Sequence, residues 1–369
     1  MPRQRGRPRT VWGDEVASTS SPESQAISLR NTQRFFPDTE DNIEDFKLLN
    51  HFITRPNICP VTNAPKEHRD PLHDQALLLS FAYPCILHLI HEFSALELAH
   101  QQPSRRAHYR ALADKHSTQG LRGATALLSR LDEGDYHAAY TAATFACINY
   151  FARGPQPGEF LLFSSHGPSQ WLPLLHGIRT IIDMVGIEKI AAGPTKNGLQ
   201  RVAPAEEPAK VFLGCPDLDW VGHFEQLHTF AASCLNFAPD IDALNRLQWC
   251  YEATYGRDGV FKGDVDQQNA FIWPYQLGEE FTVRMQTQQP LSLIVAAHFA
   301  LLLQNYEFTW YMVGWSDHII AGIAQTIDEN YRSWLEWPIE QARRIRLEKE
   351  QNKPATVFDL TMPDEPMPV

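Results

Sequence analysis

Apolar residues recur at steps of three and four along most of this chain, and this pattern constrains its fold more than any other feature. One helical face is formed by Ile86, Leu89, Ile90, Phe93 and Leu96. No run of five or more residues alternates apolar with polar side chains, as a half-buried strand would. The pattern therefore predicts a nearly all-α fold.

We interpret residues 41–349 as one helical domain between two tails. The tails, 1–40 and 350–369, are rich in Pro and polar residues without apolar periodicity, so they are predicted to be disordered. Within the domain, a polar loop is expected after Tyr255. The helices predicted beyond residue 130 are Tyr136–Phe151, Pro168–Val185, Asp217–Phe237, Pro239–Tyr255, Leu277–Gln286, Pro290–Tyr306, Phe308–Asn330 and Tyr331–Lys349.

Composition excludes two classes of protein. With 43% hydrophobic residues and nine tryptophans, the 369-residue chain can build a large core and is not a disordered protein. Its longest mainly apolar stretch, Leu291–Leu303, is interrupted by His298 and is shorter than the about 20 residues of a membrane helix. We therefore expect no membrane span.

The charge of the chain is uneven. The formal net charge is −12, yet the first ten residues hold four arginines and no acid. An acidic body repels phosphate, so contact with nucleic acid is expected at the N-terminus. The residues concerned are Arg3, Arg5, Gly6, Arg7, Pro8 and Arg9.

The Arg-Gly-Arg-Pro core of this tail is the core of an AT-hook. Glycine lets the backbone follow the floor of the minor groove, where Arg5 and Arg7 would lie in the negative potential of A·T-rich DNA. Arg3 and Arg9 would add phosphate contacts. Two other readings stay open: a tail for nuclear import or non-specific binding, and a tail without a role.

Motifs of catalysis are missing from the sequence. There is no G-x-S-x-G, P-loop, G-x-G-x-x-G or C-x-x-C pattern, so we assign no catalytic residue and expect no cofactor. His88 and His91 are one helical turn apart and could share a metal ion, but no third ligand is evident and no metal site is expected. His298, inside an apolar helix, needs a partner: a backbone carbonyl or the hydroxyl of a hydrophobic ligand.

The helical domain resembles the effector domain of fungal zinc-cluster transcription factors of the sterol uptake control type. His88 occupies the place of that family's mid-helix histidine, and Tyr109 and His116 are similarly placed in the next helix. The resemblance spans roughly residues 43–340. It is carried by five segments in the family's order: Leu48–Phe52, Leu79–Ala99, Trp171–Arg179, Trp310–Trp315 and Trp334–Pro338.

The resemblance implies an irregular multi-helix bundle with long loops and a hydrophobic internal cavity, commonly for a sterol, in a protein that is often dimeric. Homo- or heterodimers are therefore possible partners, together with DNA and a hydrophobic small molecule. Residues of these segments and of the apolar helix around His298 are pocket candidates: His88, Phe93, His298, Trp310 and Trp315.

Family members carry an N-terminal cluster of six cysteines that holds two zinc ions, whereas the first cysteine here is Cys59. The cluster would lie on a missing upstream exon, or the chain reaches DNA through its tail or a partner, or the domain has been freed from DNA. We accordingly expect a nuclear transcription regulator that controls metabolic genes. The alternatives are a cyclase-like enzyme or carrier in secondary metabolism, and a heterodimer partner that does not bind DNA.

Overall fold

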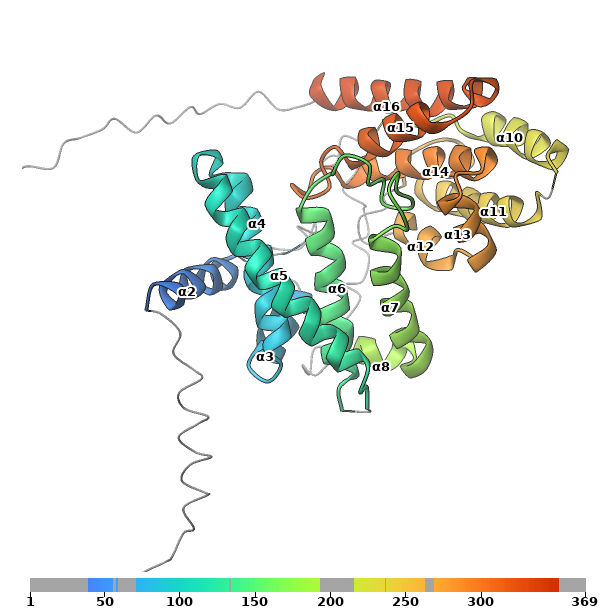
Figure 1. The fold of residues 1–369 in the computed structure, drawn as a ribbon. Coiled ribbons are helices and arrows are strands. Elements are labelled where there is room, and N and C mark those ends of the chain that lie inside the picture. Colours follow the sequence, from blue (N-terminus) through green and yellow to red (C-terminus); the bar gives the residue numbers. More distant parts are fainter. Residues whose placement is uncertain are drawn as a thin grey trace, which may run out of the picture. The chain divides into compact units, whose positions relative to one another are not determined.

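The computed structural model describes residues 39–55, 58, 71–132, 134–192, 216–235, 237–262 and 269–351. Within these ranges the regular elements are all helices (Figure 1), and the only strand-like pairings are two isolated bridges, Gln156 with Glu159 and Glu159 with Ser164. The all-α prediction is therefore confirmed. Arg3 to Arg9 and the segment 352–369 lie outside the described residues.

The chain divides into two compact units, Met1–Lys47 and Leu48–Val369. The first unit is described only from Thr39, where α2 (Thr39–Thr54) begins, and Lys47 forms an ion pair with Glu44 one turn before it. The second unit starts within the same helix and contains every other described element. The site discussed below belongs entirely to this second unit.

The N-terminal half of the second unit is organised around α4, which packs against α3, α5 and α6. Proline stands at the first position of α4, where its missing N–H leaves no hydrogen bond unmade. Helix α6 in turn packs against α7. The helices are α3 (Pro71–Ser80), α4 (Pro84–Gln101), α5 (Arg106–Leu128), α6 (Tyr136–Ala152), α7 (Trp171–Val185) and α8 (Ile187–Ala192).

The C-terminal half surrounds α14, which is buried on every side from Leu291 to Leu303. Helices α11, α12, α13, α15 and α16 all pack against it. At 14 residues it is about 21 Å long, less than the about 30 Å of a bilayer core. The helices are α10 (Val221–Ser233), α11 (Ala238–Tyr255), α12 (Asn269–Gln276), α13 (Glu279–Gln286), α14 (Pro290–Leu303), α15 (Trp315–Thr326) and α16 (Ser333–Gln351).

Among the described helices, none is both long and apolar enough to span a membrane. The apolar stretch that raised this question, Leu291–Leu303, is instead the centre of the hydrophobic core. Its lack of a polar face follows from this position, because a helix that is covered all round has no side to present to water.

Several predicted boundaries are wrong: the helix predicted over Asp217–Phe237, for example, spans only Val221–Ser233. Two further differences have a clear physical cause. The helix expected from Phe308 begins only at Trp315, because Gly314 adopts a left-handed conformation with φ of +81° and its N–H is bound by Glu307. The polar loop expected after Tyr255 contains a short helix, α12. Its Trp273 is fully buried and donates its indole N–H to the carbonyl of Ala243, a tertiary contact that local composition does not reveal.

Candidate functional site

Helices α4 and α5 approach each other unusually closely, and glycines on α5 make this possible. A short connection joins the two helices, so they run antiparallel. A Cβ atom built on Gly123 would lie 2.6 Å from the Cβ of Cys85, and one built on Gly120 would lie 2.9 Å from the Leu89 side chain. Any larger residue at these positions would force the two helices apart.

We expect Gly123→Ala to destabilise the protein by about 1–3 kcal/mol, because the new methyl group overlaps the Cys85 side chain. Gly177, inside α7, is the matched control, since nothing lies within 4 Å of its Cβ position. Gly177→Ala should stabilise the helix by about 0.5–1 kcal/mol. Urea unfolding of both variants measures the two signs, and equal signs would contradict the close approach of α4 and α5.

Three histidines meet beside this contact. His116 lies one turn before Gly120 on α5 and faces His88 and His91 of α4. The Nδ1 atoms of His88 and His116 are 3.0 Å apart, and the His91 and His116 rings meet edge to face with centroids 4.8 Å apart. One ring nitrogen from each of the three lies within 4.8 Å of the others. His91 and His116 are buried, and His88 is partly exposed.

Three imidazoles at this spacing could hold a metal ion. In a tetrahedral zinc site with metal–nitrogen distances of about 2.05 Å, the ligand nitrogens lie about 3.3 Å apart. The His88–His116 distance is already close to this value, whereas the widest separation in the group, up to 4.8 Å, would have to shorten when an ion binds. Among the described residues, no second group of three His, Cys, Asp or Glu side chains is arranged in this way.

A buried ion-pair network lies next to the histidines and joins α4, α5 and α6. The Glu92 carboxylate, only 2% exposed, accepts hydrogen bonds from Asn149 and from Arg153 at 2.7–3.0 Å. Arg153 also pairs with Asp114 of α5 at 2.6 Å. Burial raises the pKa of the Glu92 carboxyl, and the charge of Arg153 opposes this rise. Two carboxylates against one guanidinium give the network a net negative charge when all three are ionised.

The pocket candidates from the sequence fall into four separate places. Phe93 lies against Trp310 with ring centroids 5.9 Å apart, and Trp310 stacks on His100. The Trp310 indole N–H is buried and has no acceptor among the described residues. Trp315 donates its indole N–H to the carbonyl of Phe151 and is fully enclosed. His88 belongs to the histidine cluster described above.

His298 lies in a different part of the core, with both of its ring nitrogens bonded. Its Nδ1 is 2.7 Å from the carbonyl oxygen of Ile294, which can only accept, so Nδ1 carries the proton. Its Nε2 therefore accepts a hydrogen bond from the Nε2–H of His223 at 2.8 Å. Trp337 of α16 stacks on both rings. Of the two partners that the sequence left open, the backbone carbonyl is the one that the structure places there.

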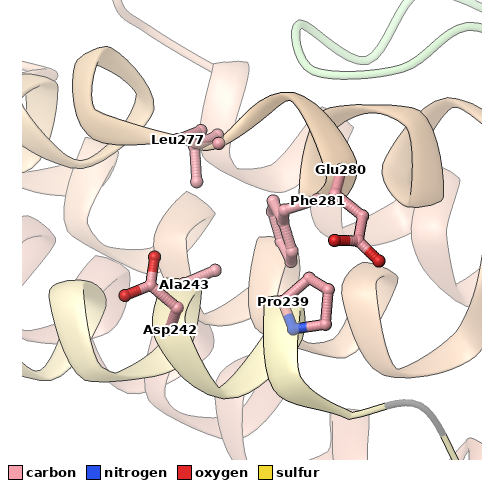
Figure 2. Close-up of a pocket in the computed structure, with 7 residues that line it drawn as sticks. Pro239, Asp242, Ala243, Leu277, Glu280 and Phe281 are labelled. Carbon is pink, nitrogen blue, oxygen red and sulfur yellow. The ribbon is translucent and has the colours of Figure 1, made fainter.

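Two hollows on the surface of the described part of the chain are considered for a ligand. The smaller, about 170 Å³, lies between α11 and α13; Figure 2 shows Phe281 beside Pro239, with Asp242 and Glu280 also lining the hollow. The larger, about 460 Å³, is lined by Asp217, Asp219, Asp258, Trp337 and Arg344 among others. Both are open to solvent and carry acidic side chains. Neither is the predicted hydrophobic internal cavity, which stays a prediction.

The fold and this site define an all-α protein with a histidine cluster and an ion-pair network between its helices. The chain matches no known family model, and no curated protein is similar to it. Sequence reasoning missed two neighbours: His116 beside His88 and His91, and His223 beside His298. The sequence feature that could have indicated the first of these contacts is the pair Gly120 and Gly123. These glycines let α5 pack closely on α4 and so bring His116 to that helix.

Proposed function

We propose that this chain is a nuclear transcription regulator whose helical body is an effector domain that responds to a hydrophobic metabolite. The observation that carries the proposal is the presence of the five segments of the resemblance in the family's order, and the structure shows where they lie. Phe52 and Phe93 both contact Phe145, and Phe93 contacts Trp310. These segments are widely separated in the sequence and meet in one core, as an effector-like fold would require.

The remaining segments join the same core. Trp171 and Trp315 both pack edge to face on Phe151. Trp337 stacks on the ring of His298 at the centre of the C-terminal half. All five segments contribute residues to one cluster of buried residues.

We propose that the hydrophobic ligand binds at the contact between Phe93 and Trp310. Phe93 and Tyr311 are buried against Trp310, so a ligand would have to separate these rings. The buried Trp310 indole N–H would then donate to a single hydroxyl or carbonyl of a sterol-like molecule. Such a ligand would favour one arrangement of the helices over another and so change access for DNA or a partner.

DNA binding through the basic tail is tested by fluorescence anisotropy on A·T-rich and G·C-rich duplexes between about 50 and 200 mM salt. The wild-type chain is expected to prefer the A·T-rich duplex. Arg5→Ala/Arg7→Ala should abolish this preference. The plot of log K against log salt should also become less steep, by about 2 in slope, since two cationic contacts are lost.

The matched control removes the same charge from the helical body. Arg122→Ala/Arg130→Ala replaces two exposed arginines at the end of α5 and beyond it and should leave the preference and the salt slope intact. A steep salt dependence without A·T preference would mean that the tail binds DNA only non-specifically. Absence of binding to either duplex would contradict direct DNA reading and favour a heterodimer partner or a carrier.

A further inference from the structure

We propose that His88, His91 and His116 bind one divalent transition-metal ion, Zn²⁺ in the first instance, and that the ion joins α4 to α5. The proposal goes beyond the regulatory function above and does not depend on it. It rests on three observations of the second unit: the distances between the ring nitrogens, the register that holds the two helices, and the charge of the adjacent network.

The ligand distances come first. Two of the nitrogens are 3.0 Å apart, and all three lie within 4.8 Å of one another. In the ion-free protein, a single proton between the Nδ1 atoms of His88 and His116 makes that short contact a hydrogen bond. A metal ion takes the place of that proton, which moves to Nε2 of the same ring, so both imidazoles stay neutral and both Nδ1 atoms donate lone pairs to the ion.

The rigidity of the frame comes second. His88 and His91 project from one turn of α4, and His116 is held opposite them because Gly120 and Gly123 fix how α5 lies on α4. Glu92, next to His91, is anchored to α6 through Asn149 and Arg153. The ligands thus stand on packed helices rather than on loops, which limits the entropy lost on binding.

The chemistry of the donor set selects the ion. Neutral imidazole is a ligand for Zn²⁺, Cu²⁺ and Ni²⁺, whereas Mg²⁺ and Ca²⁺ require oxygen donors. The Glu92, Asp114 and Arg153 network contributes a net negative charge nearby, which favours a cation. His88 is partly exposed and offers the ion a way in from solvent. Three protein ligands leave the fourth position of a tetrahedral ion to water.

The test uses the full chain after treatment with a chelator and removal of the chelator. Titration calorimetry with Zn²⁺ is expected to give one site per chain. Co²⁺, which substitutes for Zn²⁺, should give the intense visible absorption of a tetrahedral ion. Since loss of residues that only orient a ligand weakens metal binding about 10–100-fold, removal of a ligand in His88→Gln or His116→Gln should weaken Zn²⁺ binding at least 100-fold.

The matched control is His108→Gln, an exposed histidine about two turns earlier on α5, which should bind Zn²⁺ as the wild type does. Because His116 is buried and its variant could unfold, the decisive variant is the partly exposed His88→Gln, with its fold checked by far-UV circular dichroism. Zn²⁺ should raise the melting temperature of the wild type and of His108→Gln but not of His88→Gln. Undiminished binding by a folded His88→Gln, or no binding by the wild type, overturns the proposal.

Discussion

Arg284→Met is expected to lower the free energy of unfolding by about 3–5 kcal/mol, because it removes one partner of a buried ion pair. The carboxylate of Asp240 is completely buried at the start of α11. Arg284 of α13 donates to it through Nε at 2.8 Å and through Nη2 at 2.6 Å, and Ser292 of α14 donates at 2.5 Å. Without the guanidinium, the buried negative charge would keep the Ser292 hydroxyl as its one side-chain partner among the described residues.

The same helix provides a matched control for this prediction. Arg246 pairs with Asp242 one turn apart on the exposed face of α11, and such exposed pairs contribute about 0.3–0.5 kcal/mol. Urea unfolding of Arg246→Met should therefore show almost no change. The double variant Asp240→Asn/Arg284→Met should recover part of the loss, because it removes the uncompensated charge. Similar losses for Arg284→Met and Arg246→Met would show that the buried pair does not hold these three helices together.

The helices themselves were largely predictable, because their apolar positions and their proline starts are local signals. Helix α14 illustrates this: Pro290 stands at its first position, and the apolar run after it extends for almost four turns. The boundary at Trp315 was not predictable, since it depends on Glu307 binding the N–H of Gly314 after the chain has turned. Helix α12 likewise depends on a tertiary contact, between Trp273 and Ala243.

The candidate site was only half predictable for a related reason. The spacing of His88 and His91 is visible in one helix, but His116 belongs to another helix and becomes their neighbour only through the register of α4 and α5. That register depends on glycines, because their lack of a side chain lets the two helices pack closely. The pair of His223 and His298 was hidden in the same way, because 75 residues separate the two rings that share a hydrogen bond.

The His223–His298 pair is expected to make the protein less stable as the pH falls from about 6.5 toward 4. Burial lowers the pKa of His298 to about 3 and the pKa of His223 to about 4. His223 should take up its proton first, because it can do so on Nδ1 and still donate from Nε2. Protonation of His298 on Nε2 would instead place its N–H opposite the Nε2–H of His223, and the hydrogen bond between the rings would be lost.

The sign follows from proton binding. Below pH 6.5 the unfolded chain binds protons at both histidines and the folded chain does not, so the stability that the neutral pair contributes is present above this pH and is lost below it. The fully buried His298 alone adds a slope of up to about 1.4 kcal/mol per pH unit. His223 adds less, because solvent reaches part of its ring.

The measurement is the free energy of unfolding in urea at several pH values from 7.5 to about 5, for wild type and for His298→Gln. Glutamine can form hydrogen bonds with both neighbours but does not titrate. The stability of the His298→Gln variant should therefore fall less steeply with decreasing pH than that of the wild type. His166→Gln, on an exposed loop, should keep the wild-type slope. Glu92 and Glu307, whose pKa values burial raises, oppose the loss but do so equally in all three proteins. Parallel curves for wild type and His298→Gln would mean that the buried pair accepts a proton without cost, which contradicts the neutral tautomers assigned to it.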